Sequence, residues 1–567
     1  MKMSPSLALI SFSASLGLSA ACGSSGHSAS EDQTSGAQAV SSESTAKLDC
    51  AGDDGGWPMF GQNLCNTRSA SDSEPLNAKT ASKLAVKWKF QAAGDISATP
   101  AVVGNDLFVP DWGGMLNKID TRTGKADWSV SIGALIAGSD AGPGPNDAPA
   151  PIVSRDTPIV TDDSVIFGVG SLGFPKSLAI VAAVDRTTGA LKWQTQVDPH
   201  PAAVVTSSPV FDRGRVYVGV SSAEELVAAL PITNHVPYTC CSFRGSVVAL
   251  DAPTGKLLWK TYTIEDSAYF NTDGTTPSGY AGTAVWSSPT IDRKRRSLYV
   301  TTGNNYSQPA GAGALPPGDH VESILSLDLA TGAIKWAQRM TAGDIWNFYI
   351  YFANGPSAGG PDWDFGSGAN LFQASVNGVK RDVLGAGQKS GIYWAVDPDS
   401  GHVLWNQPVG PGGHLGGIHW GTAVDPKHIY VGVNDETGAA YTLGGTRAQA
   451  GQQTTVGSWA ALNPSNGEIE WQVANPAMTA PILGASVNGP VSAANGVVFG
   501  GSMDTNGTMF AFDGETGAQL WSFQSGATVY GGPAIANGVV YWGNGYPASR
   551  LRFGTPGGTL YAFQVAE

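Results

Sequence analysis

The feature that most constrains this chain is a spacing motif that recurs seven times. In each copy an Asp, once an Asn, is followed four residues later by Gly and eight residues later by Trp. The tryptophans of the seven copies are Trp128, Trp193, Trp259, Trp336, Trp405, Trp471 and Trp521. A fixed motif at intervals of about 50 to 77 residues indicates a repeat architecture, in which each copy belongs to one structural unit.

Each copy of the motif has the chemistry of a β-hairpin. The Asp side chain can accept hydrogen bonds from turn amides, and the Gly can adopt a positive φ. The stretches before the copies, such as residues 207–220 and 287–303, predict strand, tight turn and strand. Each repeat therefore contributes about four antiparallel strands. No segment has a sustained helical period, and 74 Gly and 35 Pro would interrupt long helices.

Four-stranded sheets that repeat around an axis make a β-propeller, in which neighbouring blades bury each other's faces. The recurring Trp is large enough to fill the wedge between two blades. Trp88 lacks the Asp-x-x-x-Gly element, and residues 558–567 resemble the strand that Trp88 would need as a partner. We therefore expect an all-β, eight-bladed propeller over residues 50–567, closed by pairing of its N- and C-terminal strands.

The N-terminus predicts export. Residues 1–21 are typical of a secretory signal, and the segment before Cys22 resembles a bacterial lipoprotein box. Lipidation of Cys22 would make it the sole membrane contact, at the periplasmic side or the cell surface; ordinary signal cleavage nearby is the alternative. Residues 22–49 are rich in Ser and Gly and predict a disordered tether.

The remaining cysteines form two groups. Cys50 and Cys65 could form a disulfide in an oxidising compartment. Cys240 and Cys241 are adjacent, so they form either a strained eight-membered disulfide ring or two free thiols. The chain has no Cys-x-x-Cys-His motif, which excludes a covalently attached c-type haem. The net charge of −14 and the low charged fraction of 14% argue against a nucleic-acid partner and are compatible with a basic electron-transfer protein.

Four polar residues near strand ends are not explained by the repeat: Glu224, Asn304, Asp364 and Lys389. Equivalent strand ends of different blades converge on the axis of a propeller. Two carboxylates and an amide oxygen suit Ca²⁺, and a lysine beside them would hold an anionic or carbonyl oxygen. Taken singly, each residue also has a plain structural interpretation, as a solvated carboxylate, a turn residue, a turn cap or an exposed lysine.

Several stretches, in this order, resemble the PQQ-dependent (quinoprotein) alcohol dehydrogenases, and polyvinyl-alcohol dehydrogenases in particular. They are SSAEE, the Cys-Cys pair before FRGSVVALDAPTG, AVWSSPTID, TTGNN, PDWDFGSGANLF and GQKSGIYWAVDPDSG. The resemblance covers essentially the whole chain after the signal. It implies an enzyme that oxidises alcohols with the cofactor PQQ and Ca²⁺.

The resemblance also implies a role for each matched residue. Glu224, Asn304 and Asp364 would bind Ca²⁺, and Asp364 would be the catalytic base. Lys389 would bond the quinone oxygens, Trp286 would stack on the cofactor, and Thr206 would bond one of its carboxylates. A Cys240–Cys241 disulfide would cover the opposite face of the cofactor. His419 stands where the family commonly places Asn beside a Trp.

The chain departs from the family pattern at several positions. The adjacent cysteines follow the Glu motif instead of preceding it, and Ala284 stands where a Thr often helps to hold the cofactor. Gly366 replaces the second Asp of lanthanide-using relatives, which favours Ca²⁺. Polyvinyl-alcohol dehydrogenases often carry a haem domain ahead of the propeller, where this chain has the tether. The two electrons taken from the alcohol must leave the cofactor one at a time, so a separate cytochrome c is the expected electron acceptor.

Two questions stay open at the level of sequence. The expected substrate is a secondary or polymeric alcohol, but a small primary alcohol or a polyol is also compatible with the loops 137–151, 263–280 and 306–319. The alternative function is that of a non-enzymatic outer-membrane propeller lipoprotein that acts as an assembly scaffold. Such scaffolds lack the set of Glu, Asn, Asp and Lys residues found in this chain.

Overall fold

The computed structural model describes residues 48–567 except 51, 53–54, 72, 137–150, 172–177, 234, 236, 355–358, 479–485 and 548–553. The chain divides into residues 1–44 and 45–567, and all described residues belong to the second unit. The signal at 1–21, Cys22, most of the tether and most of the loop 137–151 therefore lie outside the described residues. Within the described part, no helix is long and apolar enough to cross a membrane.

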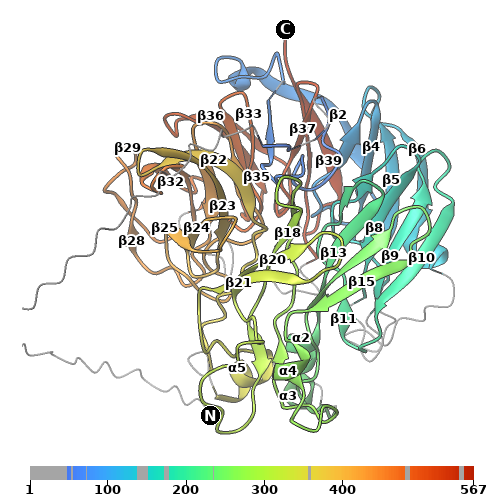
Figure 1. Ribbon diagram of the computed structural model, residues 1–567. Helices are drawn as coiled ribbons and strands as arrows, with labels where there is room; N and C mark the ends of the chain where they lie inside the picture. Colours follow the sequence, from blue (N-terminus) through green and yellow to red (C-terminus); the bar gives the residue numbers. More distant parts are fainter. Residues whose placement is uncertain are drawn as a thin grey trace, which may run out of the picture. The chain divides into compact units, whose positions relative to one another are not determined.

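Eight antiparallel four-stranded blades surround a central axis, which confirms the predicted eight-bladed propeller (Figure 1). In chain order, and with the innermost strand first, the blades are β3 (Ala101–Val103), β4 (Asp106–Pro110), β5 (Met115–Asp120), β6 (Ala126–Ser131); β7 (Ile159–Val160), β8 (Ser164–Val169), β9 (Ala179–Asp185), β10 (Leu191–Asp198); β12 (Val210–Asp212), β13 (Arg215–Ser222), β14 (Ser246–Asp251), β15 (Leu257–Tyr262); β17 (Thr290–Asp292), β18 (Ser297–Thr301), β20 (Ser323–Asp328), β21 (Ile334–Arg339); β22 (Asn370–Val376), β23 (Val379–Gly387), β24 (Ile392–Val396), β25 (Val403–Pro408); β26 (Ala423–Val424), β27 (Ile429–Val433), β31 (Ser458–Leu462), β32 (Ile469–Ala474); β33 (Ser492–Ala494), β34 (Val497–Gly501), β35 (Thr508–Asp513), β36 (Gln519–Gln524); and β37 (Ala534–Ala536), β38 (Val539–Gly543), β39 (Thr559–Val565), β2 (Leu84–Gln91).

The two ends of the described chain share the last blade, as predicted. Strand β2 pairs antiparallel with β39, with Val86 opposite Phe563, so the first long strand is the outer strand of the eighth blade. The Trp521 indole N–H of the seventh blade donates to Leu84 O at 2.9 Å, and this contact joins the last two blades. This pairing closes the ring, so among the described blades each one is packed against a neighbour on both faces.

The packing of Gly on Trp explains why the motif recurs. Gly255 has a φ of 71°, and a Cβ at this position would lie 2.4 Å from Trp193 Cε3 of the preceding blade. The Trp193 Nε1–H donates to Ala252 O in the same turn, at 2.8 Å. Equivalent Gly-on-Trp contacts are Gly124 on Trp88, Gly189 on Trp128, Gly332 on Trp259, Gly401 on Trp336, Gly467 on Trp405 and Gly517 on Trp471. The Gly and Trp of the motif therefore form a packing contact between consecutive blades and not a contact within one blade.

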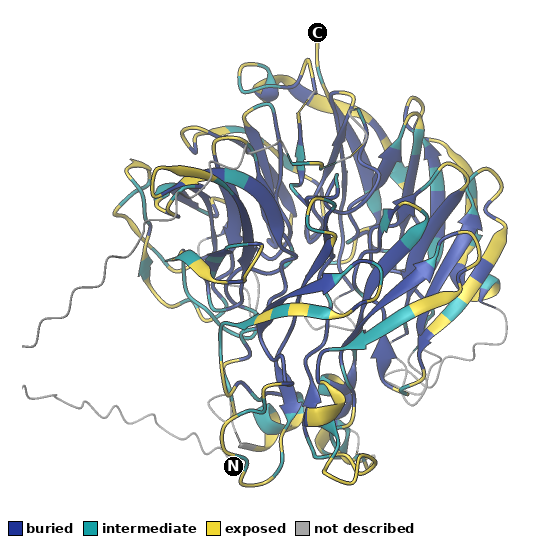
Figure 2. Cartoon of the chain, in the orientation of Figure 1, coloured by how far each residue is buried: buried dark blue, intermediate teal, exposed yellow. Residues whose placement is uncertain are grey.

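Burial falls from the axis to the rim of the ring (Figure 2). The inner strands are almost entirely buried, whereas outer strands such as β6 and β36 alternate between exposed and half-buried residues. This pattern is that of sheets whose faces are covered by neighbouring blades and whose outer edges contact solvent.

A segment at residues 55–70, which contains turns and positive-φ residues, runs along the innermost strands of the ring. Its backbone hydrogen-bonds to inner strands or adjoining turns of seven blades, at Val102, Val160, Ile291, Leu371, Val424, Ala493 and Asn537. Arg68 of this segment is fully buried and donates to Phe60 O, Val491 O and Ser492 Oγ. Burial lowers the pKa of Arg68 to about 9. The disulfide Cys50–Cys65 fastens the start of the segment, as the sequence suggested.

Four of the short helices lie together at one end of the ring. Figure 1 shows α2 (Glu224–Val227), α3 (Leu230–Thr233), α4 (Asp266–Tyr269) and α5 (Phe348–Asn354) together below the ring. The other helices are α1 (Ile132–Leu135) and the 3₁₀ helix η1 (Ala81–Lys83). The remaining short strands are β1 (Ser69–Ala70), β11 (Ala203–Val204), β16 (Ala281–Gly282), β19 (Asn305–Ser307), β28 (Tyr441–Thr442), β29 (Arg447–Ala448) and β30 (Gln453–Thr454).

Candidate functional site

One position before the innermost strand of every blade holds residues of which several meet near the axis. In each blade this position lies three residues before a Pro or Ala, and that Pro or Ala stands just before, or at the start of, the innermost strand. The residues at this position are Ser97, Arg155, Thr206, Trp286, Gly366, Trp420, Val487 and Tyr530. Several of these residues touch across the axis: the Trp286 and Trp420 rings are 4.8 Å apart, and the Trp420 indole N–H donates to Tyr530 Oη at 2.6 Å. The blades therefore bring unlike residues to one layer through a shared register.

A buried group of acids and one lysine lies beside this layer. The Asn304 backbone N–H donates to Asp364 Oδ1 at 2.5 Å, and Lys389 Nζ lies 3.3 Å from Asp364 Oδ2. Lys389 is closer to Asp362, with Nζ 2.8 Å from Oδ1. Desolvation opposes the charge on Lys389, but Asp362 and Asp364 outweigh it and raise its pKa. The structure thus joins three of the predicted residues, Asn304, Asp364 and Lys389.

Glu224 is not part of this group in the structure. Its carboxylate turns away and accepts hydrogen bonds from the Tyr238 hydroxyl at 2.5 Å, from Ser242 N at 2.8 Å and from Phe243 N at 2.9 Å. The adjacent Glu225 has Oε1 buried without a hydrogen-bond partner among the described atoms. Burial, followed by repulsion from Asp364, raises the pKa of Glu225 to about 8. The structure therefore places Glu225, where the sequence pointed to Glu224, beside Asn304 and Asp364.

The indole of Trp286 forms a half-buried surface in the axial layer. The Trp420 ring meets it edge-on at 74°, and the His419 ring centroid is 6.4 Å away. A Cβ on Gly366 would lie 2.2 Å from Trp286 Cη2, so only glycine fits between this indole and the Asp364 loop. His419 Nε2 is buried with no hydrogen-bond partner in the described structure. Burial, aided by the charge of Lys389, lowers the pKa of His419 to about 3, so its imidazole is neutral.

Arg155 and Thr206 supply polar groups at the same layer. The Arg155 guanidinium lies 4.8 Å from the Trp420 ring centroid and 5.6 Å from that of Trp112, and it donates to Tyr546 Oη. Within the described residues no carboxylate forms an ion pair with it. Thr206 Oγ1 is buried and has no hydrogen-bond partner in the described part of the chain. A guanidinium and a hydroxyl with open hydrogen-bonding capacity suit the carboxylates of a bound anion.

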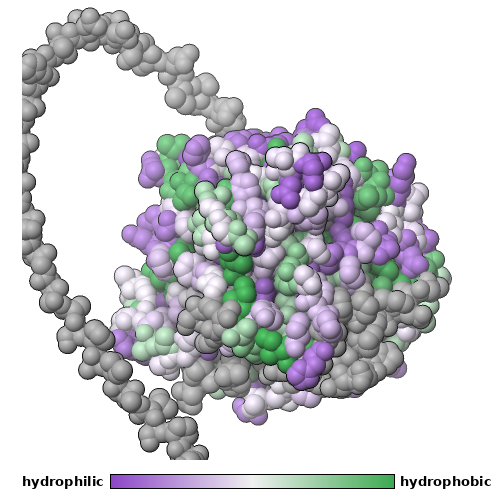
Figure 3. All heavy atoms as spheres, turned by 90° about the horizontal axis from the view of Figure 1, so that it is seen from below, coloured by the Kyte–Doolittle hydropathy of each residue, from purple (hydrophilic) through white to green (hydrophobic). Residues whose placement is uncertain are grey.

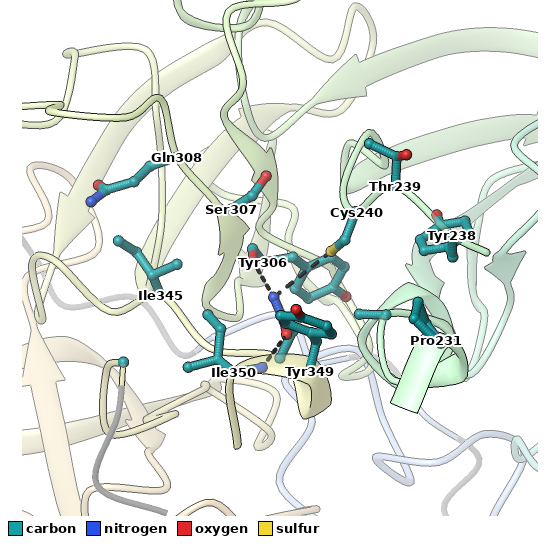
Figure 4. A pocket seen from close by; sticks show the side chains of 13 residues that line it. Pro231, Tyr238, Thr239, Cys240, Tyr306, Ser307, Gln308, Ile345, Tyr349 and Ile350 are labelled. Atoms are coloured by element: carbon teal, nitrogen blue, oxygen red, sulfur yellow. Dashed lines mark hydrogen bonds between the residues drawn. The ribbon is translucent and has the colours of Figure 1, made fainter. Parts of the chain in front are cut away.

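Cys240 and Cys241 form a disulfide, so the alternative of two free thiols is not seen. Cys240 lines a pocket of about 700 Å³, together with Tyr238, Tyr306, Asn347 and Tyr349 (Figure 4). Asn347 Nδ2 donates to Cys240 Sγ at 3.7 Å and to Tyr306 O at 2.8 Å. Burial, with added repulsion from Glu225 and Asp364, keeps the pKa of the Tyr306 phenol well above its ordinary value. Tyr306 therefore stands between the pocket and the acidic group.

The donor set fits a hard cation only in part. Glu225, Asn304 and Asp364 offer two carboxylates and one amide oxygen, whereas Ca²⁺ takes six to eight oxygen ligands. Among the described residues, no three Asp, Glu, His or Cys side chains cluster closely enough to hold a metal by themselves. The open oxygen of Glu225 and the incomplete set agree with a cation that shares its ligands with a bound cofactor.

Sequence reasoning missed Glu225, Asp362, Arg155 and Trp420. Two adjacent glutamates cannot be told apart without the turn that leads into α2. The axial register was available as a signal, because the stretches SRDTP, VTSSP and VWSSP align Arg155 with Thr206 and Trp286. The other predicted residues, Thr206, Trp286 and His419, lie in or beside the axial layer.

Two family models match this sequence. One, described as "Glucose/ethanol/alcohol dehydrogenase, beta-propeller domain", matches residues 222–411, which include the acid and lysine group. The other, described as "Outer membrane protein assembly factor BamB", matches residues 29–239 and 455–564. The chain therefore belongs to the class of β-propeller proteins that these two models cover.

Similar proteins define the family within this class. The polyvinylalcohol dehydrogenase of Sphingopyxis sp. (strain 113P3) is 32% identical over 519 residues, covering 85% of this chain and 72% of the relative. A polyvinylalcohol dehydrogenase of Pseudomonas sp. is 32% identical over 548 residues, covering 90% and 77%. The crystal structure of the quinohemoprotein alcohol dehydrogenase from Comamonas testosteroni matches the fold with a TM-score of 0.67 at 20% identity, over 90% of this chain and 80% of that one. The chain is a member of the quinoprotein alcohol dehydrogenase family, and hence a PQQ-dependent oxidoreductase.

Proposed function

We propose that this protein oxidises secondary or polymeric alcohols, such as polyvinyl alcohol, with PQQ and Ca²⁺, and passes the electrons to a separate cytochrome c. The observation that carries the proposal is the position of Asp364. It is a buried carboxylate held by a backbone N–H and by Lys389, beside a half-buried indole and an open glutamate oxygen. This is the arrangement that an alcohol-oxidising site with a planar, anionic cofactor requires.

The residues have distinct proposed roles around the cofactor. Trp286 supports one face of the ring, and the Cys240–Cys241 disulfide covers the other. Arg155, Thr206 and neutral His419 offer hydrogen bonds to its polar edge, and Glu225 with Asn304 and Asp364 holds Ca²⁺. Glu224 shapes the loop at 238–243 that carries the disulfide, so its role is one of position.

The quinone, when bound, supplies the acceptor for the hydride of the alcohol carbon. Asp364 takes the hydroxyl proton as general base, for which its oxygen must come within about 3 Å of the alcohol oxygen. Lys389 stays charged because two buried carboxylates face it, and it stabilises negative charge that develops on neighbouring oxygens. The apolar and aromatic walls exclude water, which strengthens both electrostatic effects.

The pocket of Figure 4 gives the substrate a route to the site. All of its lining residues are uncharged, although the chain has a net charge of −14. Tyr349 and Phe352 of α5 and Leu226 and Ile232 beside it are each about 40% exposed, and Figure 3 shows apolar side chains among polar ones on this end of the molecule. An uncharged mouth with an apolar rim favours a neutral alcohol with a hydrocarbon chain over a charged substrate.

Export and anchoring belong to the same proposal. A signal at residues 1–21 and a lipid on Cys22 would place the enzyme at the periplasmic side or the cell surface, with the tether giving it reach. Reconstitution tests the enzymatic part: the purified protein is loaded with PQQ and Ca²⁺, and dye reduction is followed with a secondary alcohol, polyvinyl alcohol and ethanol. We expect turnover with the first two, and loss of turnover but retained cofactor absorbance in Asp364→Asn.

The second candidate function is that of an assembly scaffold, which the family match at residues 29–239 and 455–564 favours. A scaffold needs no PQQ site, so an absence of PQQ binding by equilibrium dialysis, in protein that is folded by circular dichroism, would support it. Binding of PQQ with a one-to-one stoichiometry contradicts it.

A further inference from the structure

Two fully buried carboxyl groups, Glu322 and Asp344, lie behind the site and belong to none of the roles proposed above. Both have no exposed surface. Glu322 follows the loop before β20, and Asp344 lies in the loop between β21 and α5. Neither was singled out in the sequence, because each stands alone in a stretch without a motif.

Asp344 connects two of the segments that carry site residues. Its Oδ1 accepts the Asp362 N–H at 3.0 Å, and its Oδ2 accepts the Trp363 N–H at 2.7 Å. Its backbone carbonyl accepts the Asn305 N–H at 3.1 Å. Asp344 therefore fixes the loop that ends in Asp364 and ties it to the strand that follows Asn304.

Glu322 connects the same place to the third segment. Its Oε2 accepts the side-chain N–H of Gln388, the residue before Lys389, at 3.1 Å. Its backbone N–H donates to Gly303 O at 3.1 Å, beside Asn304. Together the two acids contact the segments of Asn304, Asp364 and Lys389.

The two carboxyl groups cannot both be ionised without a large cost in free energy. They lie within hydrogen-bonding reach of each other, and no basic side chain of the described residues forms an ion pair with either. Both oxygens of Asp344 already accept backbone N–H groups, so they act as hydrogen-bond acceptors. Glu322 Oε1 has no hydrogen-bond partner within bonding distance among the described residues, and a contact with the Thr341 hydroxyl only weakly opposes its protonation. Desolvation, followed by repulsion from Asp344 and more weakly from Asp364, raises the pKa of Glu322 well above its ordinary value.

We propose that Glu322 is a protonated carboxylic acid at neutral pH that donates its hydrogen bond to the Asp344 carboxylate, and that this pair is the positioning element for all three site segments. The proton on Glu322 removes the repulsion between the two carboxyl groups. The other oxygens of the pair accept from Asp362 N, Trp363 N and the Gln388 side chain. Loss of the hydrogen bond would free the Asp362–Asp364 loop and the turn before Lys389 at the same time. The inference rests on the proposed function only in the roles given to Asn304, Asp364 and Lys389.

The infrared spectrum of the cofactor-free protein tests the protonation directly. A protonated carboxylic acid has a carbonyl band that ionised carboxylates lack, and the band shifts in D₂O. We expect the wild type minus Glu322→Gln difference spectrum at neutral pH to contain this band, and the matched surface exchange Glu74→Gln to give none. A flat Glu322→Gln difference spectrum overturns the proposal.

Binding of PQQ and Ca²⁺ tests the positioning role. Glutamine can donate to Asp344 and accept from Gln388 as the protonated acid does, so Glu322→Gln should bind within about threefold of wild type, while Glu322→Leu should bind at least about tenfold more weakly. Equal binding by the Leu variant contradicts the positioning role. If Glu322→Leu does not fold, the infrared result and the Gln variant decide. Failure of the wild type to bind PQQ would instead count against the proposed function and leave the infrared test unaffected.

Discussion

Lys389 and Asp362 form a buried ion pair, with Nζ 2.8 Å from Oδ1. The distance from the same nitrogen to Asp364 is longer, at 3.3 Å. Asp362 therefore takes the main share of the lysine's charge, which leaves Asp364 available to the substrate. The two acids, two residues apart, therefore differ in their distance from Lys389, and the backbone of Asp362 has a positive φ of 58°.

Replacing Lys389 by Met should remove the cation that both acids face. We expect turnover to fall by about 10²- to 10³-fold, the usual effect of losing an electrostatic stabiliser. Unpaired buried carboxylates should also lower the free energy of unfolding by about 3–5 kcal/mol. Steady-state kinetics and chemical denaturation measure the two effects. Lys389→Arg, which keeps the charge, is the control, and turnover of the Met variant within tenfold of wild type would contradict the assignment.

Exchanges at Glu224 and Glu225 separate their roles. Glu225→Gln should weaken Ca²⁺ binding by about 10- to 100-fold, because the exchange removes a ligand charge. Glu224→Gln should chiefly cost about 1–3 kcal/mol of stability, because three donors lose a charged acceptor. Calcium titration calorimetry and thermal unfolding are the measurements. A larger loss of Ca²⁺ affinity in the Glu224 variant would restore the assignment made from sequence.

Removal of the Arg155 guanidinium should weaken PQQ binding. A charge-assisted hydrogen bond contributes about 1.5–3 kcal/mol, so Arg155→Met should raise the dissociation constant by about 10- to 150-fold. Arg122→Met is a matched control, since that arginine pairs with Asp120 at the surface. Fluorescence quenching of the axial tryptophans reports binding, and equal affinities of the two variants would exclude Arg155 from the cofactor site.

Asp156 makes stability depend on pH. Its carboxyl is fully buried, and desolvation raises its pKa from 3.8 to about 7. Between these two values the folded state binds more protons than the unfolded state, so the contribution of Asp156 to stability falls as pH rises and is constant above about pH 7. Asp156→Asn lacks this titration.

The stability of Asp156→Asn relative to wild type should therefore rise between pH 4 and 7, by up to about 1.4 kcal/mol per pH unit. Urea unfolding at several pH values measures the difference. The exposed exchange Asp273→Asn removes a carboxylate whose pKa is lowered, so it should give no rise in relative stability over this range. A difference for Asp156→Asn that does not change with pH would show that Asp156 is ionised throughout.

Two glycine exchanges separate backbone strain from the contact with Trp. Gly214→Ala, at φ 81° with open space around its Cβ, should cost about 1 kcal/mol. Gly255→Ala has a similar φ of 71° but would place its methyl 2.4 Å from Trp193, so it should cost about 1–3 kcal/mol more. Denaturation midpoints compare them. Equal losses would mean that the wedge tolerates a methyl group.

The ring could be predicted from sequence because each hairpin carries its contact with the preceding blade. Gly124 on Trp88 even identifies the eighth blade, whose own hairpin motif is missing. The axial layer was harder, since its positions hold residues as unlike as Arg155, Trp286 and Gly366. The choice between Glu224 and Glu225 depends on how Tyr238 and the loop at 242–243 satisfy one of them, and these contacts are distant in sequence. The pairing of Glu322 with Asp344 is likewise a tertiary contact without a local signal.

The pairing of β2 with β39 has a consequence for biogenesis. Leu84–Gln91 leaves the ribosome long before Thr559–Val565, so its hydrogen-bonding edge remains unpaired while nearly the whole ring is made. Blades two to seven can form as their hairpins emerge, but the first blade has no finished neighbour behind it until β39 has been made. Growth of the nascent protein is thus gradual, whereas closure of the ring waits for one late strand.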